Sequence, residues 1–169
     1  MPLWANASLS LLVSNGMKSA SVLNSSSANE DKLAQACAQY MFEKDEASQA
    51  FGIELLDVKC GSATAIMEVK SFMLNGHKTC HGGHIFTLAD SVFAFACNSQ
   101  NQAAVASSCT IDFIQPALKG DRLTAAAEQA HQGSRTGIYH VKVMNQHNQT
   151  IAFFKGNSAR IKRNVLPPN

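Results

Sequence analysis

The sequence of 169 residues has no long apolar run, little charge and no closely spaced pair of cysteines. No stretch approaches the roughly 18 apolar residues that a membrane-spanning helix needs. Lys and Arg (14) nearly balance Asp and Glu (12) for a net charge of +2, so no strong field favours nucleic acid or an anionic membrane. The five cysteines contain no CxxC pair, which argues against a disulfide framework or a zinc ribbon and for a reducing compartment. We therefore expect a soluble, cytoplasmic protein that binds neither nucleic acid nor membrane.

Several catalytic signatures are also missing. The run 133–137 (GSRTG) has its serine in the wrong place for a GxSxG nucleophile elbow. Neither a Walker loop nor a GxGxxG dinucleotide fingerprint occurs. Apolar residues, by contrast, make up 46% of the chain and charged residues only 15%, a balance that fits one compact domain with a sizeable core.

The first 29 residues differ in composition from the rest of the chain. They hold eight Ser, four Asn and a single charged side chain, Lys18. They lack the basic lead and longer apolar region of a secretory signal, and the arginines of a mitochondrial transit peptide. Such a composition cannot bury a core. We interpret residues 1–29 as a disordered Ser-rich leader, or as the product of an upstream start codon with Met17 as an alternative beginning, and residues 30–164 as the working domain.

Helical signals follow directly after this leader. Asn29, with Glu30 and Asp31 behind it, is typical of an N-cap with an acidic first turn, and Gly52 is a suitable helix stop. The spacing predicts a helix from residue 30 to about residue 50. Its predicted buried stripe consists of Leu33, Cys37, Tyr40 and Met41.

Six other runs are typical of strands. They cover residues 53–59, 62–70, 103–114, 121–132, 137–146 and 150–162. Short turns between consecutive runs favour antiparallel neighbours. Residues 82–98, between the second run and the third, are apolar on nearly every side of a helix, which indicates a buried helix. We predict an α+β fold in which an antiparallel sheet of five to six strands wraps around a long central helix.

Asp90 is the carboxylate within this predicted buried helix. Removing an unpaired carboxylate from water is costly, so Asp90 must face a partner, a cavity or an interface. A structural role and a functional role are equally compatible with this position. Helical spacing places it on a small, polar side of the helix with Gly83, Thr87, Ala94 and Ser91.

The start of the same helix offers a second chemical feature. The paired glycines Gly82 and Gly83 let a ligand approach the first turn closely, where unsatisfied N–H groups can donate to a developing oxyanion. This combination with Asp90 suggests acyl chemistry. The two features lie roughly 12 Å apart along one helix at 1.5 Å per residue, so a second subunit with an antiparallel helix would have to bring them together.

A metal site is the competing interpretation of this region. His77, Cys80, His81 and His84 lie within eight residues, but their spacing matches no established ligand pattern and no second cluster supplies a further pair. We therefore predict no metal site. His81 alone suits either a hydrogen-bonding role at the helix start or a contact to substrate.

The residues now form a recognisable set. The pattern N-x5-H-G-G-x6-D from Asn75 to Asp90, together with the following segments in order, closely resembles the PaaI type of hotdog-fold thioesterase. The segments that carry the resemblance are residues 75–77, 80–90, 93–99, 103–106, 109–113 and 131–133. The likeness spans about residues 33–161, and the hotdog fold, a long helix wrapped by an antiparallel sheet, agrees with the predicted architecture.

The resemblance implies hydrolysis of acyl-CoA thioesters, especially phenylacetyl-CoA and its ring-hydroxylated forms, in phenylacetate catabolism. It assigns Asp90 as general base or nucleophile, supplied by the opposite subunit of a dimer. It assigns the Gly82 N–H, assisted by the Asn75 side chain, to polarising the thioester carbonyl, and it places His81 beside the thioester. Some relatives orient water with a Ser or Thr that here corresponds to Ala106, which leaves that role unassigned.

The resemblance also implies a CoA site and an assembly. CoA is part of the substrate, and no separate cofactor is implied. Arg135 and Arg160 are suited to phosphate oxygens, and dimers are expected to pair into homotetramers. The residues implied for substrate or CoA are Gly83, Thr87, Ser134, Arg135, Thr136, Gly137 and Arg160.

Two other functions are compatible with such a domain. A hotdog dehydratase acting on carrier-bound acyl chains would use a catalytic His with a Glu on the helix, and the helix here carries Asp90 and no Glu. A non-catalytic acyl-CoA binding or regulatory protein would share the same pocket, and turnover alone would separate it from an enzyme.

Overall fold

The computed structural model describes residues 9–168, with side chains described from residue 26 onward. Its helices are α1 (Leu9–Phe42), α2 (Glu46–Phe51), the short 3-10 helix η1 (Ser71–Met73) and α3 (Gly82–Cys97). Its strands are β1 (Glu54–Lys59), β2 (Ser62–Glu68), β3 (Ala104–Phe113), β4 (Arg122–Gln132), β5 (Thr136–Met144) and β6 (Thr150–Arg160). None of the described helices is long and apolar enough to cross a membrane.

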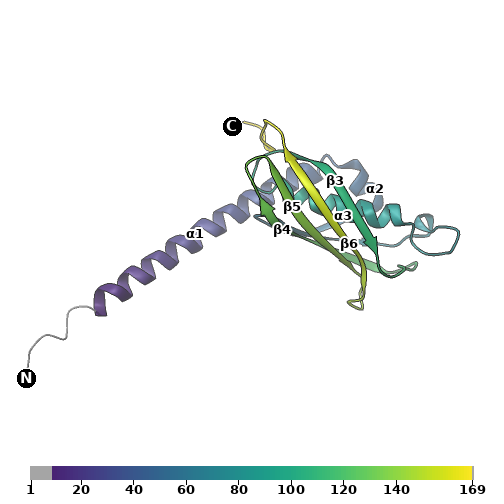
Figure 1. Ribbon diagram of the computed structural model, residues 1–169, viewed down its shortest axis with the longest axis horizontal. Coiled ribbons are helices and arrows are strands. Elements are labelled where there is room, and N and C mark those ends of the chain that lie inside the picture. Colours follow the sequence, from purple (N-terminus) through teal and green to yellow (C-terminus); the bar gives the residue numbers. More distant parts are fainter. Residues whose placement is uncertain (1–8, 169) are drawn as a thin grey trace, which may run out of the picture.

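The six strands form one antiparallel sheet in the order β1-β2-β4-β5-β6-β3. Strands joined by short turns are neighbours, whereas β3 crosses over to the far edge and pairs with β6. Helix α3 lies across one face of the sheet and packs mainly on β2, β4 and β5 (Figure 1). The predicted α+β arrangement of an antiparallel sheet around a central helix is confirmed.

The first helical region differs from its prediction in two respects. Helix α1 passes through Asn29 without a break, so Asn29 is not its N-cap. The predicted single helix to residue 50 is interrupted after Phe42, and the Asp45 side chain caps a separate helix α2 by accepting from the Ser48 N–H. Gly52 ends α2 in the left-handed conformation, as expected (φ 70°). For most of the leader assigned to residues 1–29, the side chains lie outside the part of the chain that the structure describes.

The buried stripe of α1 is rotated from the predicted one. Leu33 is exposed to 39%, whereas Ala34, Cys37 and Ala38 are buried against the rest of the core. Alanine and cysteine are small enough to let the end of α1 approach β1 closely, and a larger residue suits the outer side. The prediction that Leu33 lies on the buried stripe was therefore wrong.

The core is built around the aromatic side of α3. Phe93 is 1% exposed and packs edge-on against Tyr139, with ring centroids 5.6 Å apart. Gly156 in β6 makes room for this ring, because a Cβ atom at that position would lie 2.7 Å from Phe93 Cδ2. The absence of a side chain at Gly156 thus sets how closely α3 approaches the sheet.

We expect Gly156→Ala to lower the free energy of unfolding by about 1–3 kcal/mol, because the buried Phe93 ring must move to admit the methyl group. Urea-induced unfolding measures the change. Gly76→Ala is the matched control, since no heavy atom lies within 4 Å of a Cβ there, and it should change stability by less than about 0.5 kcal/mol. Equal stability of Gly156→Ala and the parent would show that the ring has spare room.

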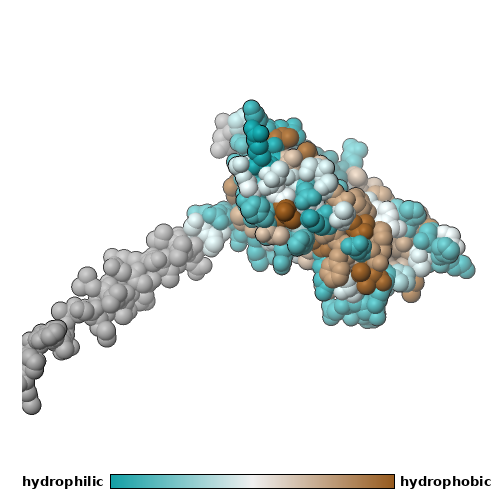
Figure 2. Space-filling model, in the orientation of Figure 1, coloured by the Kyte–Doolittle hydropathy of each residue, from teal (hydrophilic) through white to brown (hydrophobic). Residues whose placement is uncertain are grey.

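Strand β3 is an edge strand that is exposed along most of its length. An extra residue at the β3 register shift between Ala106 and Ser108 interrupts its pairing with β6. Apolar side chains gather over β3 (Figure 2), where Val105 is 50% exposed and Phe113 is 52% exposed. A long edge with unpaired backbone groups and apolar side chains is a ready template for pairing with another strand.

Candidate active site

The backbone N–H groups at the N-terminus of α3 differ in their hydrogen-bond partners. His81 is the N-cap, and its Nδ1 accepts a hydrogen bond from the Gly83 N–H at 3.0 Å. The His84 N–H donates to the His81 carbonyl at 2.9 Å. The Gly82 N–H has no acceptor among the described residues, although it points from the positive end of a buried helix. The Gly82 N–H therefore remains available to a ligand oxygen.

His81 thus takes the helix-start role that the sequence left open. Because Nδ1 accepts, the neutral ring carries its proton on Nε2. Gly83 and Thr87, both predicted to contact substrate, are tied to the same turn. The Gly83 N–H donates to His81 Nδ1, and the Gly83 carbonyl accepts a hydrogen bond from Thr87 Oγ1 at 2.9 Å.

The Asn75 side chain organises the loop before α3. Its Oδ1 accepts from the His77 N–H at 2.9 Å and the Thr79 N–H at 3.3 Å, and its Nδ2 donates to Thr79 Oγ1 at 3.0 Å. Such a side chain-to-backbone turn fixes the loop without regular secondary structure. One of the two Asn75 amide hydrogens remains for another acceptor, so a direct role in catalysis stays a prediction.

A cleft of about 450 Å³ opens beside Gly82. Phe113, at the end of β3, covers the glycine so closely that a Cβ on Gly82 would lie 2.8 Å from its Cζ atom. Glycine is required here by a close approach rather than by an unusual backbone conformation. The cleft is lined by Thr79, Cys80, Gly82, Ile85, Phe113, Ile114, Gln115 and Pro116. It is a mainly apolar space next to a free N–H donor.

Asp90 lies two turns further along α3, partly buried. Burial raises the pKa of its carboxyl group above the ordinary value, and a hydrogen bond from Cys109 opposes that effect. Cys109 Sγ lies 3.8 Å from Asp90 Oδ1. The ion pair found within residues 26–168 joins Lys59 and Asp57, so no cation in that part of the chain neutralises Asp90. A buried carboxylate of this kind is a common feature of catalytic sites.

The neighbouring Ser91 does not belong to this polar side. Its hydroxyl lies 2.9 Å from Ser48 Oγ, which donates to Asp45 Oδ2 at 2.6 Å. Ser91 therefore faces α2 and joins the two helices. The helical spacing was too coarse to separate the direction of Ser91 from that of Asp90.

The four residues considered for a metal site point to different surroundings. His77 is exposed, and Cys80 is buried with its Sγ 3.7 Å from the His81 carbonyl oxygen. The His84 ring packs edge-on against Phe51, with centroids 5.0 Å apart. Among the described residues, no group of three His, Cys, Asp or Glu side chains is arranged to hold a metal ion.

A basic cleft of about 560 Å³ lies where the β4–β5 turn meets the end of β6. The Arg160 N–H donates to the Arg135 carbonyl at 2.8 Å, which holds the two segments together. The structure thus brings together Ser134, Arg135, Arg160, Lys162 and Arg163. Thr136 and Gly137 do not line this cleft. Gly137 is buried in β5, where a Cβ would lie 2.8 Å from Ser158 Oγ.

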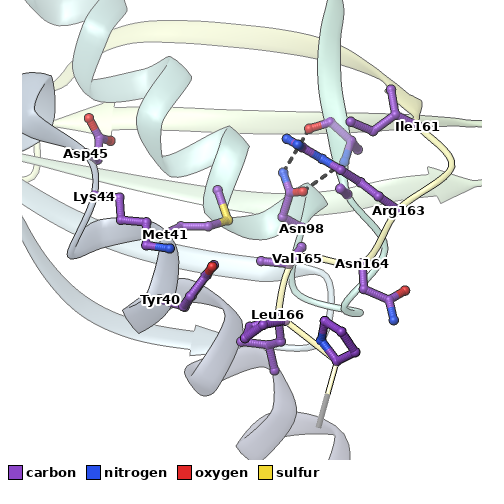
Figure 3. Close-up of a pocket in the computed structure, with 14 residues that line it drawn as sticks. Tyr40, Met41, Lys44, Asp45, Asn98, Ile161, Arg163, Asn164, Val165 and Leu166 are labelled. Atoms are coloured by element: carbon purple, nitrogen blue, oxygen red, sulfur yellow. Dashed lines mark hydrogen bonds between the residues drawn. The ribbon is translucent and has the colours of Figure 1, made fainter.

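A larger cavity of about 910 Å³ adjoins the basic cleft, between the end of α1 and the segment that follows β6 (Figure 3). Tyr40 of α1 and Leu166 of the segment after β6 are among its lining residues. The Asn98 amide, at the C-cap of α3, holds the start of β3 by donating to the Ala104 carbonyl at 3.1 Å and accepting from its N–H at 2.8 Å. Both spaces are lined by Ile161, Arg163 and Asn164. The segment after residue 164 lay outside the predicted domain, so sequence reasoning missed this cavity.

Comparison with known proteins identifies the family. Residues 77–152 match the thioesterase superfamily model. The chain is 51% identical over 124 residues to the acyl-coenzyme A thioesterase PaaI of Escherichia coli K12, a match that covers 73% of this chain and 89% of that protein. The chain belongs to the PaaI type of thioesterase. A putative esterase of Archaeoglobus fulgidus is 34% identical to this thioesterase over 142 residues, covering 84% of this chain and 92% of the relative.

Solved structures agree with this assignment. The E. coli PaaI protein from the phenylacetic acid degradation operon superposes on the thioesterase with a TM-score of 0.79 and 48% identity, covering 79% of this chain and 97% of that one. A Streptococcus mutans UA159 protein bound to acetyl-CoA superposes with a TM-score of 0.64 and 26% identity, covering 66% of this chain and 90% of that one. The hotdog fold predicted from the sequence is confirmed.

Two residues of the candidate site were missed from the sequence. Cys109 contacts Asp90, and Phe113 covers Gly82. Both lie in residues 109–113, which match the family pattern, but the match assigned no role to either residue. Their positions depend on the irregular pairing between β3 and β6. No residue type predicts such an irregularity.

Proposed function

We propose that this thioesterase hydrolyses CoA thioesters of arylacetic acids, phenylacetyl-CoA and its ring-hydroxylated forms first among them. The observation that carries the proposal is the unpaired Gly82 N–H beside an apolar cleft with the Phe113 ring at its wall. A thioester oxygen at that N–H would place its acyl group in this cleft, where an aromatic ring can pack against Phe113. The origin of the E. coli relative in a phenylacetic acid degradation operon supports the same acyl class.

The chemistry follows from the two polar features of α3. The Gly82 N–H donates to the thioester carbonyl oxygen and stabilises the negative charge that develops there. The Asp90 carboxylate either removes a proton from the attacking water or attacks the carbonyl carbon itself. When water attacks, the carbon–sulfur bond breaks, the thiolate of CoA leaves and is protonated, and the carboxylic acid is released. When Asp90 attacks, loss of the thiolate leaves an anhydride between the acyl group and Asp90, and a water molecule then hydrolyses this anhydride to the carboxylic acid and free Asp90. Asn75 and His81 have N–H groups left to assist the carbonyl, at Nδ2 and Nε2.

A second subunit completes this site in our proposal. Gly82 and Asp90 are roughly 12 Å apart along one helix at 1.5 Å per residue, so they cannot act on the same carbonyl. Antiparallel pairing of two β3 edges would place α3 helices antiparallel and bring Asp90 of one subunit toward Gly82 of the other. The exposed apolar side chains Val105 and Phe113 on this edge support such a contact. We propose a homodimer with shared sites and pairing of dimers into a homotetramer.

The basic cleft is the proposed site for the phosphates of CoA. Arg135 and Arg160 have the planar donor groups that suit phosphate oxygens, and Lys162 and Arg163 add charge at the rim. Ser134 supplies a hydroxyl in the same cleft. The acetyl-CoA bound to the S. mutans relative supports a CoA site on this fold.

We expect Arg135→Gln to raise KM for acyl-CoA about 10-fold with little change in kcat, because it removes a phosphate contact present in both ground and transition states. Steady-state kinetics at low ionic strength measure the change. Arg122→Gln is the matched control, since Arg122 is an exposed cation at the start of β4, outside this cleft. A KM that Arg135→Gln leaves unchanged would contradict a phosphate contact at this residue.

The function itself is tested by release of free CoA thiol. Phenylacetyl-CoA, 3-hydroxyphenylacetyl-CoA and straight-chain acyl-CoAs of matched length are compared at equal concentration. We expect kcat/KM to be highest for the arylacetyl thioesters. A preference for straight-chain thioesters would contradict the proposed arylacetyl specificity but not thioester hydrolysis itself. Binding of CoA without cleavage of any thioester would contradict an enzymatic function and would indicate a CoA-binding protein instead.

A further inference from the structure

Asp90 and Cys109 meet where α3 packs against β3. The contact joins Cys109 Sγ and Asp90 Oδ1 at 3.8 Å. Cys109 pairs with Gly156 in the sheet, one residue after the register shift in β3 ends at Ser108. Because glycine has no side chain, the space beside Cys109 on this face is left to the residues of α3, including the Phe93 ring.

The two serines before Cys109 are engaged elsewhere. Ser107 Oγ donates to the Asn157 carbonyl at 3.0 Å, and the Asn157 amide donates to Ser108 Oγ at 2.7 Å. Neither hydroxyl contacts Asp90 among the described hydrogen bonds. The β3 side chain that reaches the carboxylate is therefore the thiol, although hydroxyl groups stand next to it in the sequence.

The Cys109 thiol is protonated and can therefore donate a hydrogen bond. Burial, followed by the nearby charge of Asp90, raises the pKa of Cys109 to about 11, so the thiol keeps its proton at neutral pH. Cys97, on α3 itself, is the other titratable group that senses Asp90, and burial raises its pKa to about 12. Its Sγ donates instead to the Ala94 carbonyl at 3.5 Å. No Lys, Arg or His in residues 26–168 forms an ion pair with Asp90.

We propose that Cys109 is a positioning residue for the hydrolysis proposed above, on which this inference rests. Its S–H donates to Asp90 Oδ1 and fixes the rotation of the carboxylate. Oδ2 is then left to face the attacking water or the thioester carbon. The hydrogen bond also favours the ionised carboxylate, which is the form that a base or a nucleophile requires.

The pH dependence of kcat/KM tests this role. Without the donor, the Cys109→Ala protein binds a proton at Asp90 more readily, so the acidic limb of the profile moves to higher pH. We expect the rate at about pH 5.5 to fall by about 3- to 10-fold, and the rate at about pH 8 to fall less. Cys109→Ser keeps a donor, so its acidic limb should lie at or below that of the wild type. Cys60→Ala, which removes an exposed thiol in the β1–β2 turn, is the control.

A purely structural role predicts a different result. Cys109→Ala and Cys109→Ser would then lower the rate equally at all pH values, or not at all, and either result would overturn the proposal. Titration of the Asp90 carboxyl by carbon NMR gives an answer that does not depend on turnover. A wild type that cleaves no thioester would refute the proposed function, whereas an Asp90 titration unchanged by Cys109→Ala would refute the role of Cys109.

Discussion

Asp90→Asn is expected to abolish most thioester hydrolysis while leaving the fold intact. The amide has the same shape as the carboxylate but can neither accept a proton from water nor attack a carbonyl carbon. Loss of a general base typically lowers the rate by about 10²- to 10⁴-fold, and loss of a nucleophile has at least this effect. Release of CoA thiol from phenylacetyl-CoA by wild type and variant, at equal concentrations of folded protein, measures the loss. A variant that keeps more than about a tenth of the wild-type rate would remove Asp90 from the mechanism.

The same substitution should not destabilise the protein at neutral pH. Burial raises the pKa of Asp90 above its ordinary value, so the folded state binds its proton more tightly than the unfolded state does. The contribution of Asp90 to stability is therefore fully present below the unfolded pKa and is lost as the pH rises through the folded pKa. We expect Asp90→Asn to match or exceed the wild-type Tm at about pH 7.5, with the difference shrinking at about pH 4. A large fall in Tm would instead assign Asp90 a structural role.

The fold could be predicted because its local signals agree with one another. Residues 82–98 are apolar on nearly every side, as a buried helix must be, and turn residues separate strands that are neighbours in the sheet. The crossover of β3 to the far edge has no such signal, because it depends on which edge is free once β4, β5 and β6 have paired. The break between α1 and α2 depends on one capping side chain, that of Asp45, within a continuous helical pattern.

The candidate site was predictable where chemistry is concentrated in one element. Gly82 and Asp90 stand on a single helix, so their types and spacing were visible in the sequence. Cys109 and Phe113 reach them from β3, and Arg135 and Arg160 meet through pairing of segments far apart in the chain. The family resemblance predicted the two arginines, whereas the contacts of Cys109 and Phe113 became apparent only in the three-dimensional structure. Contacts of this kind follow from strand register, which a one-residue irregularity is enough to change.

Gly82→Ala is expected to lower kcat/KM about 100-fold, although the backbone N–H that it carries remains. The new Cβ would lie 2.8 Å from Phe113 Cζ and 3.3 Å from its Cε1, so the ring or the helix start must shift. A displacement of about 1 Å between a donor and a reacting group costs about this much in rate, and the loss should appear in kcat because the oxyanion forms only in the transition state. Gly76→Ala, which meets no atom within 4 Å, should keep the wild-type rate.

The steric cause can be separated from any other effect of the methyl group by shortening its neighbour. Phe113→Leu removes the part of the ring that the new Cβ would meet, so the double variant with Gly82→Ala should regain part of the lost kcat. It should also lose preference for arylacetyl over straight-chain thioesters, because the aromatic wall of the cleft is gone. Full activity of Gly82→Ala alone would show that the Phe113 ring moves aside without cost. It would contradict the proposed role of the Gly82 N–H, because that role depends on a fixed position of the donor.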